Sequence, residues 1–187
     1  MEQPNMRERI LAAAEKRVRA AGFAEMSFRD IADDIGIKSA SVHYHFKTKA
    51  DLGEALVEAY TARFRAALAT IGQGDMTTAF AGFVALYNQA LVLDEAICLC
   101  AIMGAEAIGL PSQVNARTSA FFDMNVDWLK ALFSAHAGKD HAALALLIVT
   151  ALEGAIIVSS TSRSRQVFET VAKELGELVS ARVTVKA

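Results

Sequence analysis

The chain has 187 residues, of which 53% are hydrophobic and 21% are charged, and its formal net charge is −2. Such a chain can bury a substantial core in one large or two small domains, and it can keep an apolar cavity or subunit interface as well. The composition excludes collagen-like and low-complexity proteins, and its two cysteines are too few for a disulfide scaffold or a zinc site, so we expect no metal, no cofactor and reduced thiols.

The first fifty residues are predicted to form three helices, and they begin without the apolar stretch of a secretory signal. The first helix begins near Pro4 and ends at Gly22, because glycine can adopt the left-handed conformation that a helix end often needs. The second helix is short. Its N-cap is Ser27, with Asp30 three residues later as in a weaker form of the capping box, and it ends at Gly36.

The third helix, residues 39–46, has a distinctive surface. Val42 and Phe46 lie four residues apart and are expected to face the core together. The outward residues are small, hydroxyl-bearing or aromatic, and lysines flank them: Lys38, Ser39, Ala40, Ser41, His43, Tyr44, His45, Lys47 and Lys49. Residues 1–49 carry nine Lys and Arg against seven Asp and Glu, whereas the remainder is net acidic. Two short helices joined by a glycine turn, the second cationic outside, predict a helix-turn-helix unit that binds DNA.

The side chains of this segment suit contacts with DNA. Serine hydroxyls can donate to or accept from base edges, and Ala40 can contact a thymine methyl group. Tyr44 and the histidines can contact phosphates or sugars, and Arg29 is placed to reach the backbone or a base. Thr48 is placed to cap a fourth helix, whose positive end would hold a phosphate together with Lys49. A solvated basic turn on any helical protein is the alternative, which charge alone favours.

Residues 23–52 resemble the DNA-binding region of the TetR repressor family. The family pattern reads G-[FY]-x-x-x-[ST]-x-x-x-I-A-x-x-x-G-V, followed by S-x-x-x-[LI]-Y-x-[HY]-F-x-[SN]-K-x-x-L. The matching residues are Gly22, Phe23, Ser27, Ile31, Ala32, Gly36, His45, Phe46, Lys49 and Leu52. Lys38 stands where serine is usual, so we expect Ser39 to take over the capping. His43 stands where tyrosine is usual, and Tyr44 follows it.

The resemblance implies an all-α protein of about nine helices. A helix-turn-helix domain would span residues 1–48, and a ligand-binding and dimerisation domain would span residues 49–187. It also implies a cytoplasmic, homodimeric repressor that binds a palindromic DNA operator and is released by a small apolar or electrophilic inducer. By the same resemblance, the residues that contact DNA are Arg29, Lys38, Ser39, Ala40, Ser41, His43, Tyr44, His45 and Lys49.

Six further helices are predicted at 49–71, 76–93, 95–108, 112–136, 140–162 and 164–183. Glycines at 72 and 74 separate the first two of these helices, and the sequence GLP at 109–111 separates the third from the fourth. Aromatic and thioether side chains are dense here, which is ordinary for a core but also suits an apolar ligand pocket of roughly several hundred cubic ångströms. The resemblance places that pocket among the fifth to eighth helices. Its candidate lining residues are Phe83, Tyr87, Cys98, Met103, Phe122, Trp128 and Glu153.

Two acids and one cysteine in this part invite a narrower interpretation. Glu106 and Glu153 lie on otherwise apolar faces, and each is either a surface residue or a polar anchor for a ligand. The stretch CLCAIMGAE resembles the region of TetR-type repressors in which a cysteine opens the sixth helix, and some of those proteins sense electrophiles or oxidants. Cys98 is therefore a candidate sensor, with a buried structural thiol as the alternative.

The last two helices carry the predicted dimer interface, because small and apolar residues recur in 142–156 and again in 168–178. The run 142–160 approaches the length of a membrane span. Glu153 interrupts it, however, at a cost of roughly 2.5–3.5 kcal/mol if it faced lipid, so no membrane is expected as a partner.

Two other classes of protein remain as alternatives, a helical enzyme and a helical interaction protein without sequence-specific DNA binding. The sequence shows no Ser-His-Asp order, phosphate-binding glycine loop or metal-ligand spacing, so we expect no catalytic residue. Salt-dependent DNA affinity would distinguish a regulator from an interaction protein.

Overall fold

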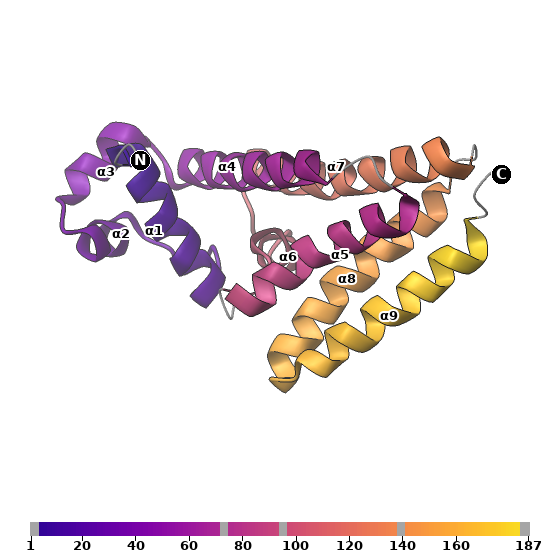
Figure 1. The fold of residues 1–187 in the computed structure, drawn as a ribbon. Coiled ribbons are helices and arrows are strands. Elements are labelled where there is room, and N and C mark those ends of the chain that lie inside the picture. The colour runs from indigo at the N-terminus through magenta and orange to yellow at the C-terminus, as the bar shows by residue number, and fades with distance from the viewer. Residues whose placement is uncertain (1–3, 72–74, 94–96, 138–140, 184–187) are drawn as a thin grey trace. The chain divides into compact units, whose positions relative to one another are not determined.

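The structure is a computed structural model that describes residues 4–71, 75–93, 97–137 and 141–183. Within these ranges every regular element is a helix, as predicted for an all-α protein (Figure 1). The helices are α1 (Met6–Ala21), α2 (Phe28–Ile35), α3 (Ser39–His45), α4 (Lys49–Thr70), α5 (Met76–Leu93), α6 (Leu99–Ala105), α7 (Ser112–Ala137), α8 (Ala142–Ser162) and α9 (Arg165–Arg182).

Most predicted helix bounds agree with the structure to within two residues, and α6 is the exception. It was expected over 95–108 but runs only from Leu99 to Ala105, and turns follow it up to the break before Pro111. The predicted helix starts at 95 and 140, and the predicted glycine break at 72–74, lie outside the described residues.

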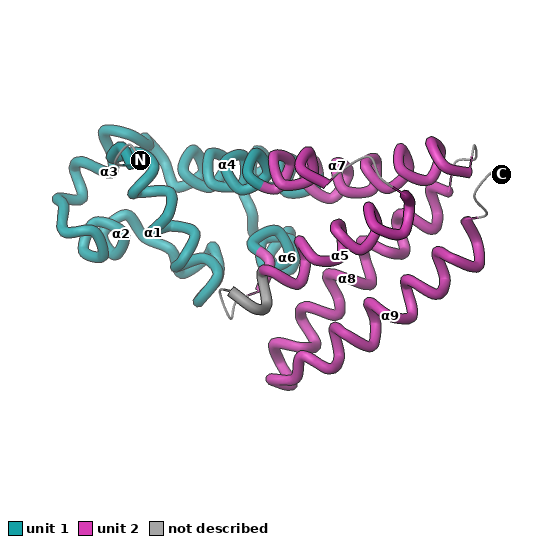
Figure 2. The backbone as a smooth tube through the Cα atoms, in the orientation of Figure 1, with its two compact units in different colours: residues 1–63, 99–119 teal, residues 64–98, 120–187 magenta. Residues whose placement is uncertain are grey.

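The chain divides into two compact units, each built from two stretches of sequence (Figure 2). Unit 1 comprises residues 1–63 and 99–119, and unit 2 comprises residues 64–98 and 120–187. Helices α4 and α7 therefore each begin in unit 1 and end in unit 2, while α6 belongs to unit 1. The division at residue 49 that the sequence suggests would have placed α6 with the second part of the chain.

Local capping residues set the first two helices of unit 1. Asn5 and Glu8 form a reciprocal capping box at the start of α1. The Glu8 N–H donates to the Asn5 side chain with an N···O distance of 3.0 Å, and the Asn5 N–H donates to the Glu8 side chain at 2.9 Å. Ser27 caps α2 as predicted, because its Oγ accepts a hydrogen bond from the Asp30 N–H at 3.2 Å. Gly36 ends α2 in the left-handed conformation, with φ 70° and ψ 39°, and so permits the tight turn into α3.

The caps of the next two helices differ from one another. Lys38 occupies the N-cap of α3 and makes no side-chain capping bond, because its ammonium group has no acceptor to offer the free N–H groups. The prediction that Ser39 caps this helix is wrong, since Ser39 is its first helical residue. Thr48 caps α4 as predicted, and it exchanges two hydrogen bonds of 3.1 and 2.9 Å with Asp51.

The core of unit 1 holds α1, α2 and α3 together, and α2 packs against both of the others. Val42 and Phe46 are buried as predicted, along with Ile10, Ile31 and Leu52. These apolar contacts fix the orientation of α3, so the opposite face of that short helix remains at the surface.

Unit 2 contains α5, α8, α9 and the second parts of α4 and α7, and α5 packs against both α8 and α9. Helix α8 is long and apolar enough to cross a membrane by length and composition, but half of its most apolar window is buried within unit 2. Leu152 and Ile156 of α8 are fully buried, as is Ile148. These contacts identify α8 as a core helix of this unit.

Candidate nucleic-acid interface

Helix α3 presents a polar face on the side opposite the buried Val42. Tyr44 is the most prominent residue of this face, with 77% of its surface exposed. The other predicted DNA contacts on and beside α3 are exposed or half-buried: Lys38, Ser39, Ala40, Ser41, His43 and His45. Arg29 is exposed on α2. The structure therefore brings these predicted residues to the surface of unit 1.

Ring contacts hold the aromatic residues of this face in place. The His43 ring lies edge-on to Phe28, the first residue of α2, with ring centroids 4.6 Å apart. The Tyr44 ring lies edge-on to His45 at 5.2 Å. Such contacts restrict side-chain rotamers, so the polar edges of these residues have less freedom to lose when they bind a partner.

Lys49, at the start of α4, is tied to the connection between α1 and α2. Its Nζ donates a hydrogen bond to the backbone oxygen of Ala24 at 2.7 Å and lies 4.9 Å from the centre of the Phe23 ring. An ammonium group has three donors, so this lysine can keep that bond and still donate to a phosphate.

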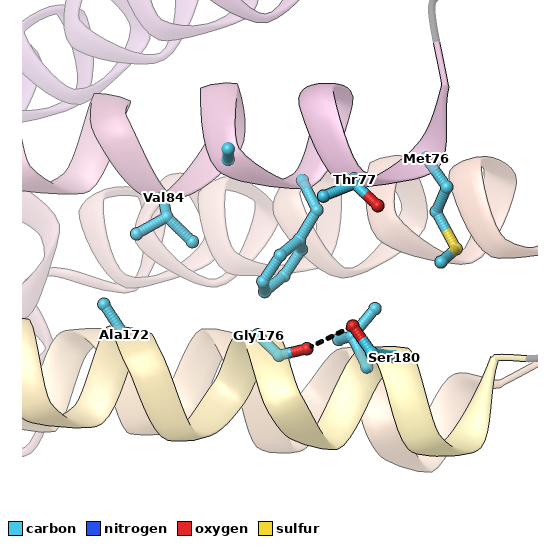
Figure 3. A pocket seen from close by; sticks show the side chains of 9 residues that line it. Met76, Thr77, Val84, Ala172, Gly176 and Ser180 are labelled. Atoms are coloured by element: carbon cyan, nitrogen blue, oxygen red, sulfur yellow. Dashed lines mark hydrogen bonds between the residues drawn. The ribbon is translucent and has the colours of Figure 1, made fainter.

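Unit 2 contains an apolar cavity of about 260 Å³ between α5 and α9 (Figure 3). Met76, Thr77 and Val84 of α5 lie across from Ala172, Gly176 and Ser180 of α9, and the Ser180 hydroxyl donates to the Gly176 carbonyl at 2.9 Å. The small side chains of α9 leave this space open. None of the seven ligand residues that the sequence predicted lines this cavity.

Four of those seven residues instead take part in aromatic packing in unit 2. Phe83 is fully buried and stacks on Trp128, with ring centroids 5.2 Å apart and an interplanar angle of 12°. Tyr87 contacts Phe83 at the same centroid distance. The ring centroids of Phe122 and Phe121 lie 5.6 Å apart. Phe83 and Tyr87 are buried, whereas Phe122 and Trp128 are half-buried.

Cys98 and Glu153 are brought together in the interior of unit 2, whereas Met103 is buried in unit 1. Burial raises the pKa of Glu153 well above its usual range, and the neighbouring Cys98 side chain raises it further. Glu153 is only 8% exposed, and within the described residues neither of its carboxyl oxygens has a hydrogen-bond partner of good geometry. It is therefore a buried acid and not a surface residue.

Glu106 has a role that the sequence did not predict. Its carboxylate accepts hydrogen bonds from the backbone N–H groups of Phe23 and Ala24, at 2.8 and 2.9 Å. These residues are about eighty positions apart, so no local pattern links them.

In the part of the chain that the structure describes, no group of three or more His, Cys, Asp or Glu could hold a metal ion.

A buried apolar face on α3, a left-handed glycine before it and an exposed polar face together define a helix-turn-helix unit that binds DNA. Two family models match the chain. "Bacterial regulatory proteins, tetR family" covers residues 10–56, and "Transcriptional regulator LmrA/YxaF-like, C-terminal domain" covers residues 76–174, more than half of the chain. The chain belongs to the TetR family of DNA-binding transcriptional regulators.

Solved structures agree with this assignment over nearly the whole chain. A TetR transcriptional regulator from Legionella pneumophila is 29% identical, with a TM-score of 0.89, and the match covers 95% of this chain and 99% of that one. A TetR-family regulator from Agrobacterium tumefaciens is 22% identical, with a TM-score of 0.85 and 97% of both chains covered. The reduced form of E. coli NemR, 19% identical over 98% of this chain and all of its own, has a TM-score of 0.81 and shares the fold. Among curated proteins, no sequence matches this chain.

Proposed function

We propose that this regulator is a cytoplasmic homodimeric repressor, which binds a palindromic operator and releases it when a small apolar inducer occupies unit 2. The observation that carries the proposal is the exposure of Tyr44 and its neighbours opposite the buried Val42. A helix anchored on one side and polar on the other can enter the major groove, which is about 12 Å wide, and present side chains to base edges. By this proposal Arg29 and the predicted residues from Lys38 to Lys49 contact DNA.

The second protomer is proposed to bind on α8. Four large apolar residues of this helix are exposed in the single chain, Leu146 by 58%, Leu147 by 47%, Ile157 by 41% and Val158 by 51%. Gly154 lies between these two pairs, and a Cβ atom added to it would meet nothing within 4 Å. An apolar stripe with a small residue at its centre suits close packing against a copy of itself across a two-fold axis.

The inducer is proposed to occupy the cavity between α5 and α9. Its lining is mostly apolar, and its volume of about 260 Å³ is close to the lower end of the roughly 300–1,000 Å³ that ligand pockets have. An inducer that binds one of two conformations shifts the population towards it, and a coupling of about 1–3 kcal/mol would change operator affinity roughly 5–150-fold. Cys98 is 2% exposed beside Glu153, and reactive thiolates favour electropositive, partly exposed surroundings. We therefore propose reversible binding, and not attack on an electrophile, as the signal.

Selection of bound sequences from random duplex DNA by the purified protein tests this function. We expect a palindrome whose half-sites lie about 34–36 Å apart, because a two-fold dimer places its two reading helices in successive major grooves. The same experiment performed at two salt concentrations controls for attraction by charge alone. A failure to enrich any sequence, or enrichment of single half-sites only, would contradict the proposal.

Tyr44→Ala is expected to weaken binding to the selected operator by about 5–100-fold, because the exposed tyrosine is proposed to make base or sugar contacts. The slope of log K against log salt should stay unchanged, since tyrosine carries no charge. Lys38→Gln should instead reduce that slope by about 1, as expected for the loss of one phosphate contact. Fluorescence anisotropy titrations over a salt series would measure both quantities.

Ile108→Ala is the matched control for Tyr44→Ala, because Ile108 is fully exposed but lies outside the helix-turn-helix unit. Its operator affinity should equal that of the parent. Equal affinities for the parent and Tyr44→Ala would remove Tyr44 from the proposed interface.

A further inference from the structure

The connection between α1 and α2 is held by a carboxylate from a distant part of unit 1. Glu106 follows directly after α6, and each of its two oxygens accepts one backbone hydrogen bond. Oε1 accepts from the Phe23 N–H at 2.8 Å, and Oε2 accepts from the Ala24 N–H at 2.9 Å. Hydrogen bonds to an ionised acceptor are among the stronger ones in proteins. This pair therefore adds to the one turn bond of the segment, from the Met26 N–H to the Phe23 carbonyl at 3.2 Å.

Lys49 binds the same segment through a carbonyl group and a ring. Its Nζ donates to the Ala24 carbonyl at 2.7 Å, and its charge lies over the Phe23 ring. Glu106 thus accepts from the N–H groups of Phe23 and Ala24, and Lys49 donates to the carbonyl of Ala24. We call this arrangement, formed by Glu106 and Lys49 on Phe23 and Ala24, the connector clamp.

Gly22 makes room for the clamp. A Cβ atom at this position would lie 2.3 Å from Oε1 of Glu106, closer than real Cβ contacts come. The backbone there has φ 92°, a conformation that favours glycine. The carboxylate of Glu106 therefore occupies the space that a Cβ atom at position 22 would fill.

The clamp acts on the part of the chain that orients the helix-turn-helix unit. Phe23 is buried, and its ring packs closely against α4 at Gly53. A Cβ atom added to Gly53 would lie only 2.6 Å from the ring. The connector leads four residues later into α2, which packs against α3. A shift of Phe23 and Ala24 would therefore displace α2, and α3 with it.

Resting on the proposed function, we propose that Glu106 is a positioning residue for operator binding, which acts by holding the backbone of Phe23 and Ala24 through the connector clamp. Glu106 itself does not need to touch DNA. Helix α6, which Glu106 directly follows, is joined at Leu99 to the segment of unit 2 that ends at Cys98, so a change in unit 2 has a direct covalent route to the clamp.

The sign of the effect separates this role from simple electrostatics. Removing a negative charge near a DNA-binding surface should strengthen DNA binding, because phosphates are anionic. A positioning role predicts the opposite change, since a loosened connector no longer presents α3 in one orientation. A glutamine also cannot replace the carboxylate, because its amide nitrogen does not accept a hydrogen bond from the second N–H.

We expect Glu106→Gln to weaken binding to the selected operator about 10-fold, the size of effect that the loss of one charge-assisted hydrogen bond can produce. Hydrogen exchange of the Phe23 and Ala24 amides, measured by NMR on the full-length protein, should become at least about 10-fold faster. Glu106→Asp should behave similarly, because it keeps the charge but is one methylene too short to hold both N–H groups.

Glu25→Gln is the matched control, because Glu25 is exposed on the same connector and its replacement removes the same charge. We expect operator binding by this variant to be unchanged or slightly tighter. Parent-like or tighter operator binding by Glu106→Gln would overturn the proposal, whether or not the two amides exchange faster. Unchanged amide exchange in Glu106→Gln would overturn it as well. If the parent protein itself selects no operator, the proposed function fails, and the amide exchange alone still decides whether the clamp exists.

Discussion

Placing two glutamates on the exposed face of α8, by Leu146→Glu with Ile157→Glu, is expected to abolish dimerisation and to weaken operator binding at least about 100-fold. Both residues are exposed in the single chain and lie on the proposed interface. Across a two-fold axis the double variant would bury four like charges with no partner, and each buried unpaired charge costs several kcal/mol. Because about 1.4 kcal/mol is a factor of ten, the dimer dissociation constant should rise by several orders of magnitude.

Sedimentation equilibrium at micromolar concentration measures the first part of this prediction. The mass should fall from twice the chain mass of 20.0 kDa to the chain mass itself. Operator affinity should fall with it, since a monomer reaches one half-site only. The helical circular dichroism should be retained, because the substituted side chains point away from the core of the single chain.

Ile108→Glu serves as the control for added charge, because Ile108 is also an exposed apolar residue but lies in unit 1. This variant should sediment as the parent does. A double variant that remains a dimer would show that the second protomer binds elsewhere, and α9 would then be the next surface to alter.

Local chemistry made much of unit 1 predictable from the sequence. The caps at Ser27 and Thr48 depend on residues three positions apart, and the stop at Gly36 depends on one residue's conformational freedom. Val42 and Phe46 were placed correctly because helical spacing determines which side chains share a face. The prediction that Ser39 caps α3 was wrong. The family's capping position holds Lys38 here, and the helix begins without a side-chain cap.

Unit 2 was harder to predict because α8 is apolar on every side. In such a helix the pattern does not reveal which face is buried. The structure buries Val149 and Ile156, which the sequence had assigned to the dimer interface, and exposes Leu147 and Val158. The same ambiguity affects the aromatic residues, since Phe83 could equally have lined a cavity or packed into the core.

Contacts between distant segments could not be predicted from the sequence. The bonds from Glu106 to the α1–α2 connection require the fold to bring together residues 23, 24 and 106. One alternative considered for Glu106 left its carboxylate at the surface, and the other turned it towards a ligand. Neither included a backbone partner. An acid on an apolar helix face shows that a partner is needed, but not which one.

Glu153→Gln is expected to remove a pH dependence of stability that the parent shows above pH 4.5. Burial raises the folded-state pKa of Glu153 well above its ordinary value of 4.5, so the folded protein holds this proton at pH values where the unfolded chain has released it. The slope of the free energy of unfolding against pH has the sign of the number of protons bound in the unfolded state minus the number bound in the native state. That difference is negative here, so stability falls as pH rises. The stability that comes from the shifted pKa of Glu153 is therefore fully present below pH 4.5. It is lost as pH rises through the raised folded-state pKa.

The slope of this loss is at most about 1.4 kcal/mol per pH unit, the free energy that corresponds to one unit of pKa shift. Urea denaturation of the parent and Glu153→Gln, at one protein concentration between pH 5 and 8, would measure it as the difference between the two proteins. Other titrating groups cancel in that difference, because both proteins share them. A difference that is constant with pH would show that the Glu153 proton is released equally in both states.

Glu153→Met tests the cost of the buried carboxyl group itself, apart from its charge. Methionine has a similar length and needs no hydrogen-bond partner, whereas neither carboxyl oxygen of Glu153 has a partner of good geometry among the described residues. A buried polar group left without a partner costs about 1–3 kcal/mol, so this variant should be more stable than the parent by up to that amount, even at pH 5. Glu169→Met on α9, where the side chain is exposed, should change little. A loss of stability in Glu153→Met would mean that the protonated carboxyl makes a favourable contact, and the Cys98 thiol beside it would be the first partner to examine by a double-mutant cycle.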